Sequence, residues 1–128
     1  MASFRFVAEV QVDDIAAGHH LPGYPGPCAT PHGHNWSFRA SVGADALHED
    51  MVADFIALKA VFKEIDHAML NDIADLVRDG RRPTTERLAE WMADRVQAFL
   101  DTLPNRPRLI SLTAAETRRN RVTYTPAP

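Results

Sequence analysis

An alternating segment that begins with two histidines constrains the fold of this chain more than any other feature. From Asn35 to Val42 every second residue is apolar, which is the period of a strand with one buried face. His32 and His34 precede this run on the same parity as its apolar residues. On a strand, residues two apart project from one face roughly 7 Å apart along the chain. The pattern predicts a half-buried strand that carries two imidazoles at one end of its apolar face.

Histidine is concentrated around this segment. Four of the six histidines and the one cysteine lie between His19 and His34. Neutral nitrogens from His19, His32 and His34 suit Zn²⁺ and leave a fourth position open, as in catalytic zinc sites. Two alternatives stay open: Cys28 closes a structural zinc site as the fourth ligand, or the histidines hold no metal.

Composition limits the class of protein. A length of 128 residues predicts one domain over residues 1–128. No apolar run reaches the length of a membrane span, the first residues do not resemble a signal peptide, and a lone cysteine cannot form an internal disulfide, so we expect a cytoplasmic protein without a membrane partner. The formal net charge of −3 argues against a nucleic-acid partner. Arginines at 81–82 and 118–121 form basic patches that suit either a small anionic ligand or a solvated surface.

The other elements follow from periodicity and from helix-capping residues. A loop rich in proline and glycine at 22–27 leads to Cys28. Asp54 and Thr84 are suitable N-caps for two amphipathic helices. The predicted order is ββααββ, with strands at 4–12, 32–42, 108–117 and 120–125 around the two helices.

This order predicts an α+β fold. Hairpins at both ends of the chain give a four-stranded antiparallel sheet, and two helices can cover only one of its faces. Both edges of such a sheet are free. We therefore expect oligomerisation through the edges, with subunit sheets joining into a barrel.

Three further groups are candidates for chemistry. A cation beside Cys28 favours its thiolate, which is a base or a nucleophile. Asp66 can fix the tautomer of His67 and raise its basicity, although a capping or salt-bridge role is the alternative. Glu116 shares the parity of the apolar residues before it, so its carboxylate either meets the N–H, N–H edge of an aminopyrimidinone ring or forms an ion pair with a nearby arginine.

These residues resemble the 6-pyruvoyl-tetrahydropterin synthase and 6-carboxy-tetrahydropterin synthase family, whose members have the tunnelling fold. The resemblance covers nearly the whole chain. It rests on six matched pieces in order: residues 16–24, Cys28-x3-His32-Gly33-His34-Asn35-Trp36, residues 51–55, Asp66-His67-x2-Leu70-Asn71, Pro83-Thr84-x-Glu86 and Glu116-Thr117.

The resemblance implies a role for each candidate residue and a reaction. The zinc ligands are His19, His32 and His34, the catalytic residues are Cys28, Asp66 and His67, and Glu116 anchors the pterin. The three-residue gap between Cys28 and His32 is similar to that of bacterial 6-carboxy-tetrahydropterin synthases. These lyases convert 7,8-dihydroneopterin triphosphate to 6-carboxytetrahydropterin, acetaldehyde and triphosphate in queuosine biosynthesis. The usual assembly in the family is a homohexamer of two stacked trimers.

Overall fold

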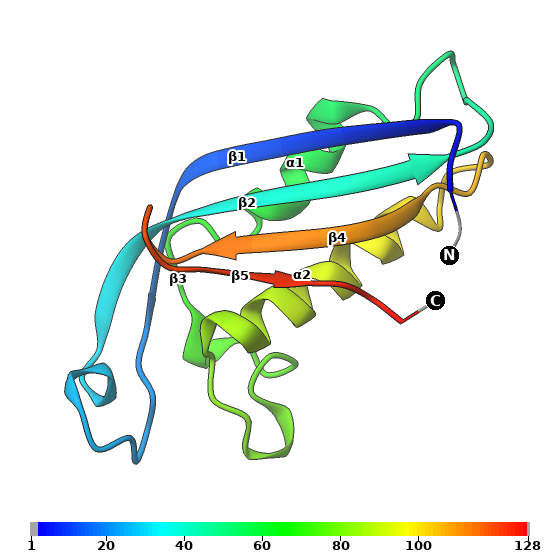
Figure 1. The fold of residues 1–128 in the computed structure, drawn as a ribbon. Coiled ribbons are helices and arrows are strands. Elements are labelled where there is room, and N and C mark those ends of the chain that lie inside the picture. The colour runs from blue at the N-terminus through cyan, green and yellow to red at the C-terminus, as the bar shows by residue number, and fades with distance from the viewer. Residues whose placement is uncertain (1–2, 128) are drawn as a thin grey trace.

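A mixed β-sheet forms one layer of the molecule, and two helices lie side by side across one of its faces (Figure 1). The computed structural model describes residues 3–127. Short 3₁₀ turns lie at Pro27–Ala29, Leu70–Asp72 and Arg78–Gly80. The main elements are β1 (Phe6–His19), β2 (His32–Ala44), α1 (Phe55–Lys63), β3 (Ala68–Met69), α2 (Thr85–Leu100), β4 (Arg108–Ala115) and β5 (Arg121–Tyr124).

The α+β class and the ββααββ order of the main elements are confirmed. The sheet has the strand order β3-β1-β2-β4-β5, and its four main strands pair antiparallel. It contains one strand more than expected, because Ala68 and Met69 pair parallel to Ala17 and Gly18 at the edge of β1. Two residues are too few to show a sequence period, so this strand has no signal in the sequence.

A β-bulge in β1 decides which of its side chains face the helices. Val12 pairs with Phe38 and Ile15 with Trp36, so β1 contains one extra residue at this point. Before the bulge the buried residues have even numbers, and after it they have odd numbers. Asp14 in the bulge has a φ of 61°, in the left-handed region. The change of phase turns His19 toward the same face as His32 and His34.

The core lies between the sheet and the two helices. Phe38 of β2 stacks on Phe62 of α1 with ring centroids 5.6 Å apart, and both side chains are fully buried. The helices begin where the capping residues predict, since Asp54 accepts the N–H groups of Ile56 and Ala57, and Thr84 accepts that of Arg87. No helix within residues 3–127 is long and apolar enough to cross a membrane. In the part of the chain that the structure describes, no helix covers the opposite face of the sheet (Figure 1).

Candidate metal centre

Three imidazoles converge at the ends of β1 and β2. The ring centroids lie 4.5 Å apart for His19 and His32, 4.9 Å for His32 and His34, and 5.3 Å for His19 and His34. Glu116, directly after β4, joins them, and ligand atoms from these four residues all lie within 4.8 Å of one another. The structure therefore brings together the three histidines that the sequence predicts as zinc ligands.

Backbone carbonyls orient two of the rings. His19 Nδ1 lies 2.7 Å from the carbonyl oxygen of Pro83, and His32 Nδ1 lies 2.7 Å from that of Thr30. A carbonyl can only accept a hydrogen bond, so both Nδ1 atoms carry a proton, and in the neutral form of each ring Nε2 is the nitrogen with a free lone pair. Metal-binding histidines are commonly fixed in this way.

The inner atoms of the group lack ordinary partners. His19 Nε2 and His34 Nε2 are buried without a hydrogen bond among the described residues. His34 Nε2 is 2.6 Å from Glu116 Oε1, but the two are not aligned for a hydrogen bond. Burial, reinforced by His19 and His32 and opposed by the Glu116 carboxylate, lowers the pKa of His34 and so favours the neutral form that binds metal. Buried, unpartnered nitrogens facing a carboxylate fit a divalent cation such as Zn²⁺.

Trp36 and Thr85 support the group from the helix side of the sheet. The Trp36 ring is fully buried and meets His19 and His34 edge to face, with centroids 5.2 and 5.4 Å away. Its indole N–H donates to the carbonyl of Ala17. Thr85, the first residue of α2, donates its hydroxyl to Glu116 Oε2 over 3.1 Å. These contacts hold the imidazoles and the carboxylate in fixed orientations.

Cys28 lies near the group along the chain but is not part of it. It is half-buried in the 3₁₀ turn Pro27–Ala29, and its carbonyl accepts the N–H of Leu21. Within residues 3–127, the group of ligand atoms that could hold a metal does not include its thiol. This placement favours three histidine ligands over the alternative in which Cys28 closes a structural site.

Asp66 and His67 form a pair beside β1. Asp66 Oδ1 lies 3.2 Å from His67 Nδ1 and also accepts the N–H of Ala16. The His67 side chain is 83% exposed, and its φ of 67° lies in the left-handed region, in the turn between α1 and β3. His67 and His34 border the same open hollow of about 410 Å³. No hydrogen bond among the described residues joins this pair to the Cys28 thiol.

Comparison with known proteins identifies the family. The family description "6-pyruvoyl tetrahydropterin synthase" matches residues 9–127. The chain belongs to this family.

Two relatives and one solved structure are similar to this member of the family. A Bacillus subtilis protein named 6-carboxy-5,6,7,8-tetrahydropterin synthase is 37% identical over 117 residues, which cover 88% of this chain and 80% of the relative. A Pyrococcus furiosus protein named dihydroneopterin monophosphate aldolase is 37% identical over 73 residues, covering 54% of this chain and 58% of the relative. The structure of Caenorhabditis elegans 6-pyruvoyl tetrahydropterin synthase superposes with a TM-score of 0.73 at 22% identity, covering 98% of this chain and all of that one, and this likeness shows the fold.

In this family member the structure adds residues that sequence reasoning did not assign to the site. The Pro83 carbonyl contacts His19, and the Thr85 hydroxyl contacts Glu116. Both come from the Pro83-Thr84-x-Glu86 piece, to which the sequence assigned a helix start and a family match but no role at the site. The Asn71 side chain forms two hydrogen bonds with the backbone of His20: it accepts the N–H and donates to the carbonyl. Among the described residues Glu116 forms no ion pair with an arginine; its Oε1 lies 2.6 Å from His34 Nε2 and 3.9 Å from His19 Nε2.

Proposed function

We propose that the chain is a zinc-dependent 6-carboxy-5,6,7,8-tetrahydropterin synthase. The proposed reaction converts 7,8-dihydroneopterin triphosphate to 6-carboxytetrahydropterin, acetaldehyde and triphosphate, a step of queuosine biosynthesis. The observation that carries the proposal is the convergence of His19, His32 and His34 with two buried, unpartnered Nε2 atoms. The name of the Bacillus subtilis relative supports this choice of reaction.

The three histidines hold the zinc in this proposal, and Glu116 holds the substrate. A bound zinc supplies Lewis-acid chemistry that lowers the pKa of hydroxyl groups. The Glu116 carboxylate can accept two parallel hydrogen bonds from the N–H, N–H edge of a pterin ring. Because Thr85 donates to one of its oxygens, the carboxylate is oriented before the substrate binds.

The remaining candidates move protons. Cys28 supplies a thiol on the loop before β2, and we assign it to proton transfer at the side-chain carbons of the substrate. Asp66 Oδ1 lies 3.2 Å from His67 Nδ1, so we assign this carboxylate to orienting the ring and His67 to proton transfer. The His67 side chain is 83% exposed and borders an open hollow, so its ring is accessible to a substrate.

Product analysis tests the reaction. The purified protein is loaded with zinc and incubated with 7,8-dihydroneopterin triphosphate, and the products are separated by chromatography. Acetaldehyde and 6-carboxytetrahydropterin are the expected products. Formation of 6-pyruvoyl-tetrahydropterin instead would contradict the proposal and select the sibling activity.

A related pterin side-chain lyase is the second candidate. The Pyrococcus furiosus relative, which is named an aldolase of dihydroneopterin monophosphate, supports this candidate, and its match covers about half of the chain. The same assay with dihydroneopterin monophosphate as substrate separates the synthase from the aldolase. Faster turnover of the monophosphate than of the triphosphate selects the aldolase.

Substitution of Cys28 separates an enzyme from a non-enzymatic zinc-binding domain. Cys28→Ala is expected to keep zinc, because the thiol lies outside the group of ligand atoms. It is expected to abolish turnover, because the thiol is assigned to proton transfer. His32→Ala is the matched variant and is expected to lose zinc and turnover together. If Cys28→Ala loses zinc, and the wild-type protein turns over neither pterin, the site is structural.

We propose a homohexamer of two stacked trimers as the working assembly. Most of the outer edge of β1 is free of β3, and β5 forms the other edge of the sheet. Joining these edges between subunits satisfies their unpaired backbone groups.

A further inference from the structure

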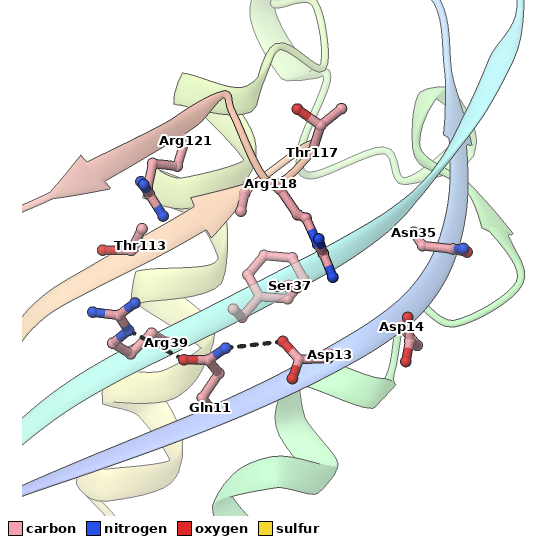
Figure 2. A pocket seen from close by; sticks show the side chains of 12 residues that line it. Gln11, Asp13, Asp14, Asn35, Ser37, Arg39, Thr113, Thr117, Arg118 and Arg121 are labelled. Carbon is pink, nitrogen blue, oxygen red and sulfur yellow. Dashed lines mark hydrogen bonds between the residues drawn. The ribbon is translucent and has the colours of Figure 1, made fainter.

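A hollow of about 560 Å³ lies on the face of the sheet that the helices leave uncovered (Figure 2). Residues of β1, β2 and β4 form its floor, and the turn between β4 and β5 forms one wall. We call it the sheet pocket. The hydroxyl and guanidinium side chains that line it are Ser37, Arg39, Thr113, Thr117, Arg118 and Arg121.

The three arginines of the sheet pocket lack carboxylate partners. Within residues 3–127, no ion pair involves Arg39, Arg118 or Arg121, whereas arginines on and around the helices, such as Arg87 and Arg95, pair with glutamates. Arg39 donates its Nε–H to Gln11 Oε1, which leaves its two terminal nitrogens free. Figure 2 shows the three guanidinium groups arranged around the same hollow.

The turn after β4 presents further donors. Thr117 Oγ1 accepts the backbone N–H groups of Arg119 and Asn120, so its own hydrogen is free to donate elsewhere. This local bonding fixes the turn from which Arg118 extends over β2 (Figure 2).

Acidic residues occupy the β1 side of the sheet pocket. Asp13 accepts a hydrogen bond from Gln11, and this bond, together with one from Ser37, lowers the pKa of Asp13. Asp14 lies beside it in the bulge. An anion is therefore repelled from β1 and drawn toward Arg39 of β2, Arg118 of the β4–β5 turn and Arg121 of β5.

The sheet pocket is separate from the metal centre. Asn35 lines it, and on β2 this residue lies between His34 and Trp36, which face the helices. Successive side chains of a strand point to opposite faces. The sheet itself therefore stands between the two sites.

We propose that the sheet pocket is a binding site for a polyphosphate chain, independent of the proposed reaction. Planar guanidinium groups match phosphate oxygens and bind them with two parallel hydrogen bonds. Three such groups with hydroxyl donors between them suit several linked phosphates, and the volume is far larger than a single phosphate needs.

Calorimetric titration of the zinc-loaded protein with inorganic triphosphate tests the proposal. Binding is expected to weaken with added salt and to be about tenfold stronger than that of inorganic orthophosphate, which can reach fewer of the arginines. Arg118→Gln and Arg121→Gln are each expected to weaken binding about tenfold. Arg119→Gln is the matched control, because this arginine is on the same turn but does not line the pocket.

Asp13→Asn removes a negative charge from the β1 side and is expected to tighten binding severalfold. Equal weakening by the substitutions at 118 and 119 would mean diffuse surface charge and would overturn the proposal. Binding that neither Arg118→Gln nor Arg121→Gln weakens would place the anion outside the sheet pocket and overturn the proposal too. The absence of binding at about 1 mM triphosphate would also overturn the proposal.

Discussion

Glu116 contacts both the histidine group and the first residue of α2, and a substitution can separate its two possible contributions. Glu116→Gln is expected to keep about one zinc per chain, because the three histidine nitrogens are unchanged. It should raise the KM for the pterin about tenfold or more, because an amide cannot accept two parallel hydrogen bonds. Zinc content by elemental analysis and steady-state kinetics on the same sample check both parts.

Glu64→Gln is a matched control for this experiment. Glu64 is an exposed glutamate after α1 that pairs with Arg95, so its substitution should change neither zinc content nor KM. A Glu116→Gln protein that binds less than half an equivalent of zinc would show that the carboxylate is a metal ligand, and the role of pterin anchor would then be wrong.

At the scale of elements, the bulge in β1 connects the sheet to the site. Deletion of Asp14 removes the extra residue, so one half of β1 must turn its inward side chains to the free face. Either His19 leaves the histidine group or Val10 and Val12 leave the core. The deletion variant is expected to lose either bound zinc or its cooperative unfolding transition, as measured by elemental analysis and thermal denaturation.

Asp14→Gly provides the comparison for the deletion. It keeps the length of β1 and suits a φ of 61°, so we expect full zinc binding and unfolding stability unchanged or raised by up to about 1 kcal/mol. A deletion protein that stays folded with a full complement of zinc would contradict the role given to the bulge.

Local patterns in the sequence were sufficient for most elements and for two of the three histidines that converge. The alternation of β2 placed His32 and His34 on the buried face, and Asp54 and Thr84 marked both helix starts. The extension of β1 to His19 was not predicted, because the bulge breaks the alternation after Val12. The contacts of Glu116 with His34 and Thr85 join segments far apart in the chain, so no local pattern contains them.

Helix α2 carries a carboxylate in an unfavourable position. Burial raises the pKa of Asp94, and Glu90 and Asp75 add to this while Arg78 opposes it. A raised folded-state pKa means that the folded protein binds the proton more tightly than the unfolded chain, so this stability is present at low pH and is lost as pH rises through the folded pKa.

Asp94→Asn should therefore raise the Tm at pH 7 by roughly 1 °C and leave it nearly unchanged near pH 3, where the carboxyl group is protonated in both states. Thermal unfolding of both proteins across this pH range checks the prediction. If the Tm gain near pH 3 is as large as the gain at pH 7, the effect does not arise from the charge of Asp94.

At the scale of the whole molecule, the two faces and the two edges of the sheet carry different features. One face holds the core and the histidine group, and the other carries the sheet pocket. The edges expose backbone groups and, at the start of β1, apolar side chains: Phe6 is 42% and Val7 is 56% exposed. Exposed apolar residues on an unpaired edge favour association with another strand.

The proposed hexamer therefore predicts that a charge on this edge will dissociate the subunits. Wild-type protein is expected to have about six times the chain mass of 14.2 kDa in light scattering after size-exclusion chromatography. Val7→Asp should shift the mass toward smaller species, because a buried aspartate at a strand junction lacks a partner. Ile56→Asp is the control, since Ile56 is 82% exposed on α1 and not on an edge strand, and its substitution should leave the mass unchanged. If Val7→Asp keeps the full mass while Ile56→Asp reduces it, the subunits associate through the helices, and the barrel joined at sheet edges is wrong.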